Sequence, residues 1–472
     1  MVMKNTVQKL LFIATILLLF QACKSDDNGY SDVNDDSDDG GGISLPISAQ
    51  PDSGETFQNA TLELAILSND ENVPEDARIT FSEPGSGMVS LLDPNNTPTN
   101  VLDDIASYQP DGSYVGETTF TYTVCDAEGG NCDTGTVTIN VLPFSPVNFD
   151  INEVPYDTLS EYNFFEGTMA DQNPVYGVVP YEPISALFTD YAHKNRYLWM
   201  PNGVRASYVS DADVLDFPVG TVLIKSFFYD NVQPANETQI LETRLMIRKE
   251  EGWIFADYIW NEDQSEAFFN LDGANVPISW IDDDGMSRST TYRIPSESEC
   301  FTCHKSFDSN TPIGMKPQNL DKEYPYADGL TNQLQKFITL GYLENDLPTT
   351  INTVVDYTDT SQSLDLRMRS YVDINCASCH SDGGHCDYRP LRFAFSENDD
   401  PANMGICVTP DTPIPGQTNI VVPGNINESV LYFRIDTEAE EYRMPLLGRT
   451  LIHDDAVALV ADWINSLSGT CD

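Results

Sequence analysis

The stretch Cys300-Phe301-Thr302-Cys303-His304 and its counterpart Cys376-Ala377-Ser378-Cys379-His380 share one pattern. Each stretch places two thiols three positions apart and a histidine directly after the second thiol. The chain has 10 Cys and 5 His among 472 residues, so two complete matches are very rarely produced by chance. The pattern predicts a site at each stretch that needs two sulfur atoms and one imidazole.

Covalent haem attachment accounts for this spacing. Two such thiols add across the two vinyl groups of one haem, and the next histidine then lies under the porphyrin, where a ring nitrogen binds iron. We therefore predict two haem c groups, attached at Cys300, Cys303 and His304 and at Cys376, Cys379 and His380. The alternatives are zinc, which requires no histidine at this position, and a thioredoxin-like pair, which needs a βαβ context that we do not find.

Residues 360–472 resemble a class I cytochrome c domain. A helix is expected from Leu364 to Asn375, directly before the second motif, and another from Asp454 to Leu467. Between them lies Met444-Pro445, similar to the distal-ligand sequence of such domains. The resemblance implies a mainly α region with His380 as the proximal ligand and Met444 as the distal ligand, which would favour ferrous iron. The alternative for Met444 is a core methionine.

The first attachment segment, residues 294–347, is harder to interpret. Ile294-Pro295 argues against a helix before Cys300, and apolar spacing over residues 330–343 predicts a helix further on. Met315 is a candidate distal ligand, although it lies only eleven residues after His304, and packing explains it equally well. The other candidates are His193, His385 and His453, and a five-coordinate iron is the remaining alternative.

The N-terminus has the pattern of a targeting segment. Residues 1–22 combine basic Lys4 and Lys9 with an apolar run too short for a membrane span, and Cys23 follows Ala22. This resembles a bacterial lipoprotein signal, which implies acylation of Cys23 and a lipid anchor in the outer membrane, facing the periplasm or the cell surface. A plain cleaved signal peptide is the alternative. The polar, acidic residues 23–42 predict a flexible tether.

Two β-rich regions follow the tether. Residues 43–144 contain alternating runs at 118–124 and 136–141 and resemble Ig-like or cadherin-like domains. Residues 147–293 predict a second β module, with strands at 221–229, 242–248 and 253–260. Together with the two motifs, the stretch 147–467 resembles an uncharacterised bacterial family in which a β module precedes two haem-attachment motifs. That family has no settled activity.

The other cysteines lie in a compartment that allows disulfides. Cys125 and Cys132 flank a hairpin-turn signal, Glu128-Gly129-Gly130, and could bridge adjacent strands. Cys386 and Cys407 are the second plausible pair, which leaves Cys471 free.

The whole chain therefore predicts a multidomain protein: an all-β Ig-like sandwich, a second β-rich module and a mainly α cytochrome c-like region. Its 74 acidic and 24 basic residues give a net charge of −50, which disfavours nucleic-acid binding and favours a redox partner with a basic patch. Electron transfer by a dihaem carrier is the leading expectation. A dihaem peroxidase or related oxidoreductase with an open first haem, and a surface binding module, are the alternatives.

Overall fold

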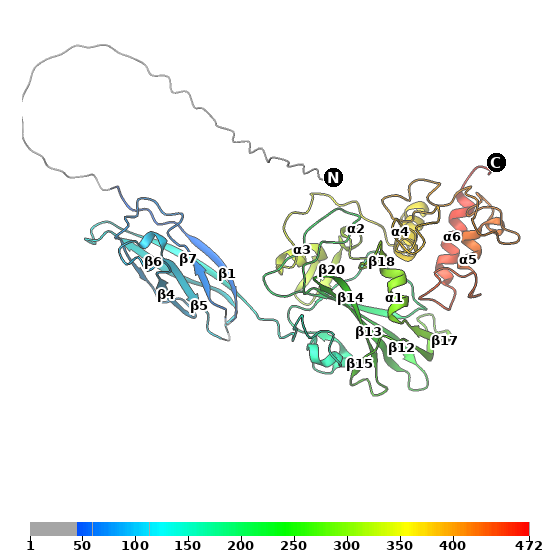
Figure 1. Ribbon diagram of the computed structural model, residues 1–472, viewed down its shortest axis with the longest axis horizontal. Helices are drawn as coiled ribbons and strands as arrows, with labels where there is room; N and C mark the ends of the chain where they lie inside the picture. Colours follow the sequence, from blue (N-terminus) through cyan, green and yellow to red (C-terminus); the bar gives the residue numbers. More distant parts are fainter. Residues whose placement is uncertain (1–44, 59, 113, 472) are drawn as a thin grey trace, which may run out of the picture.

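The computed structural model describes residues 45–58, 60–112 and 114–471 (Figure 1). The predicted signal peptide, Cys23 and the tether lie outside these residues. Within the described part of the chain, no helix combines the length and the apolar character needed to cross a bilayer.

The N-terminal unit is a sandwich of two sheets. One sheet has the order β1 (Asp52–Phe57), β7 (Cys132–Leu142), β6 (Gly116–Cys125) and β3 (Arg78–Phe81), and the other has the order β2 (Leu62–Leu64), β5 (Ile105–Gln109) and β4 (Met88–Leu92). Side chains of β6 and β7 alternate between the core and solvent, as their period-two sequence predicted. Cys125 and Cys132 end this hairpin as a register pair and form the predicted disulfide, with 4.1 Å between their Cα atoms.

The β module is built on a twisted eight-stranded sheet. Its main path runs β10 (Val179–Pro180), β11 (His193–Trp199), β12 (Val222–Val232), β13 (Glu237–Lys249), β14 (Gly252–Trp260) and β15 (Ala267–Phe269), and the hairpin β16 (Ala274–Ile281) and β17 (Ser287–Ile294) joins at β12. Both faces are covered. One face packs with Tyr162 and Tyr258, and the other packs with Cys300 and Phe337. The first attachment motif therefore lies on one face of this sheet.

Short elements complete the β-rich part. The sheet is flanked by the pair β8 (Phe165–Glu166) and β9 (Asn173–Pro174), and three short 3-10 helices occupy Val101–Asp103, Leu159–Tyr162 and Met169–Asp171. After β17 come α1 (Glu297–His304), the pair β18 (Lys305–Ser306) and β19 (Ser309–Asn310), and α2 (Pro317–Leu320). The hairpin β20 (Glu323–Tyr326) and β21 (Gly329–Asn332) then leads into α3 (Gln333–Thr339).

The helix expected over residues 330–343 is thus shorter than its apolar spacing indicates. The side chain of Asn332 accepts hydrogen bonds from the amides of Leu334 and Gln335, and this cap starts α3 at Gln333. Leu330 instead belongs to strand β21 and is exposed.

The C-terminal region has helices and long loops, and no strand among its described residues. It contains α4 (Leu364–Cys376), the 3-10 helix Ile426–Glu428, α5 (Val430–Ile435) and α6 (Asp454–Ser466), close to the helices expected at 364–375 and 454–467. Helices α4 and α6 pack around Met368, Val460 and Trp463. The arrangement brings the second motif, at the end of α4, over α5 and the loop that follows it.

The second disulfide differs from the prediction. Cys407 pairs with Cys471, with 5.1 Å between their Cα atoms. The predictions of a disulfide between Cys386 and Cys407 and of a free Cys471 are therefore wrong. The amide of Cys386 donates to the carbonyl of Cys379, which holds Cys386 beside the second motif. The chain after α6 returns to the loop of Cys407, a contact between distant segments that sequence spacing does not reveal.

Candidate functional site

The first motif lies within a short helix. Ser296 caps α1, and Glu299 accepts a hydrogen bond from the Ser296 amide and pairs with Arg293 at 2.7 Å. Pro295 follows strand β17 and precedes the cap residue Ser296, so it does not prevent a helix that starts at Glu297, before Cys300. The Ser-x-x-Glu capping signal at 296–299 was present in the sequence and predicts this start.

His304 at the end of α1 is oriented by a backbone contact. Its Nδ1 lies 2.9 Å from the carbonyl oxygen of Thr311, and its ring packs against Phe255 at 5.4 Å. Burial lowers the pKa of His304 to about 4, so the imidazole is neutral at physiological pH. With Nδ1–H donating to the carbonyl, Nε2 keeps a free lone pair, as an iron ligand requires.

The second motif continues from helix α4. The amides of Cys379 and His380 both donate to the carbonyl of Cys376, at 3.1 and 3.0 Å, which folds the motif into a tight turn. Burial, followed by the nearby arginines, lowers the pKa of His380 to about 4. Its Nδ1 is buried and has no hydrogen-bond partner among the described residues. A neutral imidazole can bind a metal, and His380 differs from His304 in lacking an orienting hydrogen bond at Nδ1.

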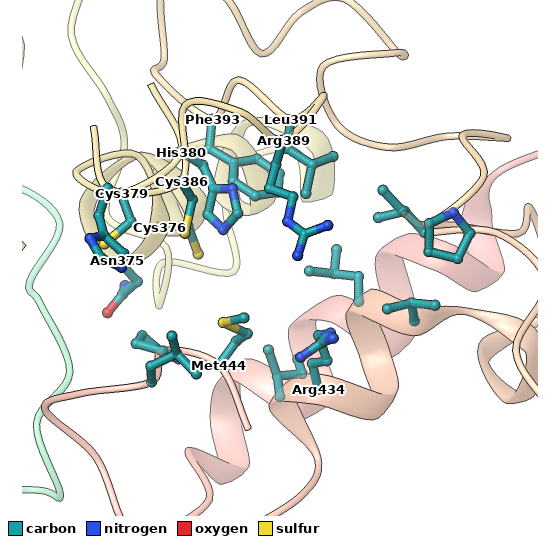
Figure 2. A pocket seen from close by; sticks show the side chains of 18 of the residues that line it. Asn375, Cys376, Cys379, His380, Cys386, Arg389, Leu391, Phe393, Arg434 and Met444 are labelled. Atoms are coloured by element: carbon teal, nitrogen blue, oxygen red, sulfur yellow. The ribbon is translucent and has the colours of Figure 1, made fainter. Parts of the chain in front are cut away.

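Met444 faces His380 across a cavity (Figure 2). The cavity has about 1160 Å³ of space, part of it open to solvent, and its lining includes Cys376 and Cys379. Its walls are mainly apolar, with Leu391, Phe393, Ile420, Val430, Leu431, Ile435 and Leu447. Two thiols, a neutral imidazole and a thioether around one apolar cavity fit the donor set and the surroundings that a c-type haem needs.

The loop that carries Met444 is held by a residue that the sequence did not single out. Arg449 is 4 % exposed, and its guanidinium donates to four backbone carbonyls. Nε donates to Met444 at 2.8 Å, and the other nitrogens donate to Arg434 at 2.9 Å and to Thr437 and Leu451 at 3.1 Å. Arg449 therefore positions Met444, the predicted distal ligand, by holding the backbone carbonyl of Met444.

The two motifs are in direct contact. The thiol of Cys379 lies 3.8 Å from the carbonyl of Thr302, and hydrogen bonding between the Cys303 and Cys379 thiols lowers the pKa of Cys303. Thr302 and Cys303 also line the cavity of the second motif. Further along, the amide of Phe307 donates to the carbonyl of Gly383 at 2.8 Å. Sequence distance gave no sign that these two stretches meet.

A strap formed by residues 186–191 joins the β module to the C-terminal region. Asp190 accepts hydrogen bonds from the amides of Thr450 and Leu451, at 2.6 and 2.9 Å, and from the Thr450 hydroxyl at 2.8 Å. Phe188 stacks on His453 with 4.0 Å between ring centroids. Asp190 and Tyr191 both have positive φ, so tertiary contacts hold this strap in a conformation unusual for non-glycine residues.

The other candidate ligands lie in different surroundings. Met315 is buried with Cys300 in the apolar core of the β module, so packing already accounts for it, and its role as a ligand stays a prediction. His193 and Tyr197 are four residues apart on β11, so their side chains lie on the same face of the sheet. Tyr197 packs on the face opposite to the one that carries Cys300. His385 lines the cavity of the second motif, and His453 is enclosed by aromatic rings next to the strap.

Cys386 is a free, buried thiol on the wall of the same cavity. The four motif cysteines are also free of disulfides. Among the described residues, no three side chains of His, Cys, Asp or Glu are grouped to hold a bare metal ion.

Comparison with known proteins assigns only the N-terminal unit. No curated protein matches the chain. An endo-fucoidan hydrolase of glycoside hydrolase family 107 matches 47% of this chain and 29% of its own at 13% identity, with a TM-score of 0.18. A quinonprotein alcohol dehydrogenase-like protein from Bacteroides thetaiotaomicron matches 51% of this chain and 79% of its own at 9% identity, with a TM-score of 0.12. TM-scores this low do not indicate a shared fold. Residues 44–140, however, match the bacterial Ig domain family, so the sandwich at the N-terminus is a bacterial Ig domain.

Proposed function

We propose that this protein is a dihaem c-type cytochrome that transfers electrons at the cell envelope. Cys300, Cys303 and His304 would hold one haem, and Cys376, Cys379, His380 and Met444 would hold the other in a class I cytochrome c-like domain. Bound iron supplies the one-electron chemistry. The protein's own residues would attach each haem, keep both imidazoles neutral and surround the second haem with apolar side chains.

One observation carries the proposal: the two motifs touch. Thr302 and Cys303 of the first motif line the cavity that also contains His380 and Met444. Groups attached at Cys303 and Cys379 would therefore be close neighbours. A short separation between two redox centres favours rapid exchange of single electrons, which suits a carrier that accepts an electron at one site and releases it at the other.

The location and partner follow from the sequence. Acylation at Cys23 would anchor the chain in the outer membrane, and the Ig domain would separate the redox region from the anchor. The net charge of −50 supports a redox partner with a basic patch, since complementary charge speeds encounter. Association with that partner should therefore weaken as ionic strength rises.

The test is maturation in a host that assembles c-type cytochromes. We expect two haems per chain that resist acid–acetone extraction, and one each after C300A/C303A or C376A/C379A substitution. C386S is the matched control and should retain two. Flash reduction of the wild-type protein should then show electron exchange between the two centres that both double variants lose. Absence of covalent haem would refute the proposal, and peroxide-dependent turnover would favour the oxidoreductase alternative.

A further inference from the structure

One face of the β module carries an apolar row and a charged row side by side. The apolar row pairs Leu198, Leu223, Met246 and Phe255 across β11 to β14, and it packs in the same core as Cys300. Two residues further along each strand, the charged row pairs Arg196, Lys225, Arg244 and Asp257. Because strand side chains alternate with period two, both rows lie on the face that the first motif covers, about 7 Å apart.

Arg244 and Asp257, two members of the charged row, both lie beside the buried carboxylate of Glu242. Arg244 forms an ion pair with the buried Glu242, which also accepts a hydrogen bond from Tyr292 at 2.7 Å. Burial and the neighbouring Glu242 charge hold the pKa of Asp257 well above its usual range.

Arg196 and Lys225, with Lys194 two residues before Arg196 on the same strand, interact with carboxylates only at longer range, namely with Glu182, Glu242 and Asp190 in turn. Lys194, Arg196 and Lys225, here called the basic cluster, make no ion pair within 4.0 Å and no side-chain hydrogen bond with any described residue, and the Lys225 ammonium lies 4.9 Å from the centroid of the Phe227 ring. Arg196 is only 9 % exposed, and Arg196 and Lys225 stand directly opposite each other in the sheet. Like charges in this position destabilise a sheet, and burial together with the neighbouring cations lowers the pKa of Lys194 and Lys225. An anion bound beside them would offset this repulsion. In a chain with three times as many acidic as basic residues, three such cations indicate an anion supplied from outside the fold.

We infer that the basic cluster holds the two propionate carboxylates of the haem attached at Cys300 and Cys303. This inference rests on the proposed function. Haem brings two carboxylates to the site, and hydrogen bonds from Lys and Arg to carboxylates are strong because both partners are charged. The cluster shares its face with Phe255, whose ring is 5.4 Å from that of His304. Lys225 also lies close enough to His304 to contribute, after burial, to its lowered pKa.

The β module would then be part of the first haem site, which explains why this haem needs no complete cytochrome c domain around it. A free oxyanion bound at the same cluster is the rival with the same chemistry. The two differ in one respect: a propionate is covalently part of the haem and contributes to its potential in every buffer.

The experiment is potentiometric titration of the full-length dihaem protein with K225Q, R196Q and K194Q substitutions. R78Q, at an exposed arginine of the Ig domain, controls for net charge. Removal of a cation beside the propionates stabilises ferric iron, so each cluster variant should lower the potential of one haem. The expected shift is at least a tenfold change in the reduction equilibrium, or about 59 mV for a one-electron couple. The haem ligated by Met444 serves as internal reference, and K225R should restore most of the loss.

The outcomes separate the two hypotheses. A wild-type chain without covalent haem refutes the proposed function itself. Two attached haems whose potentials are unchanged in all three cluster variants overturn this inference alone. A potential that shifts with added phosphate in the wild type, but not with the substitutions, assigns the cluster to a free oxyanion and also overturns it. If one variant fails to accumulate, the remaining two and K225R decide the question.

Discussion

Substitution of Arg449 by Gln should stop Met444 from acting as the predicted distal iron ligand, and it should leave the rest of the chain folded. Arg449 donates to four carbonyls of the segment 434–451, including that of Met444 itself at 2.8 Å. Glutamine is shorter and can satisfy at most two of them. Each lost charge-assisted hydrogen bond at a buried carbonyl is worth about 1.5–3 kcal/mol, so the loss of two or more should cost the loop at least about 3 kcal/mol.

The assay is optical and electrochemical. An iron ligated by His and Met shows a weak Met–iron charge-transfer band, and loss of the Met ligand removes this band and lowers the potential. We expect R449Q to lose the band while it keeps two covalent haems. R443Q is the matched control, because Arg443 makes only a 3.4 Å contact with the Glu438 carbonyl. An R449Q protein with an intact band and an unchanged potential would show that the loop does not depend on Arg449.

Three further predictions concern stability. C471S opens the 64-residue loop closed with Cys407 and should lower the unfolding free energy by about 2–4 kcal/mol in thermal denaturation; an equal loss in C386S, whose thiol is unpaired, would contradict this. Burial and then the Asp70 charge raise the pKa of Asp52 to about 6, above its unfolded value of about 3.9. The protonated Asp52 therefore stabilises the fold fully below about pH 3.9, and this stabilisation is lost as the pH rises through about 6. D52N should therefore gain about 1 kcal/mol at pH 8, after allowance for solvent screening, and nothing at pH 4 in urea titrations. G383A places a Cβ 2.7 Å from the Phe307 amide and should cost about 2–3 kcal/mol, whereas G416A, also at positive φ but in open space, should cost about 1 kcal/mol; equal melting temperatures would refute the close approach of the motifs.

Local patterns in the sequence predicted the local structure well. The alternation at 118–124 and 136–141 gave β6 and β7, and the hairpin signal between them gave the disulfide of Cys125 and Cys132. The apolar spacing at 454–467 gave α6 almost to the residue. These features depend on neighbours within about a dozen residues, which is the range over which periodicity and turn chemistry act.

Contacts between distant segments could not be predicted in this way. Cys471 reaches Cys407 only because the chain after α6 returns to that loop. Arg449 looked like one basic residue among 24, and its importance appears only when the carbonyls around it are known. The meeting of the two motifs likewise depends on how α1 and α4 are placed by the sheet and the strap, which is tertiary packing and leaves no local sequence signal.

The strap has a consequence for how the redox region would respond to its surroundings. Asp190 fixes the β module to the C-terminal region through three hydrogen bonds, and Phe188 adds a ring stacked on His453. These contacts tie the two attachment sites together, and the sites already meet in this arrangement. Electron exchange between them should be indifferent to solvent viscosity, so that glycerol slows the arrival of a partner protein and leaves the internal step unchanged.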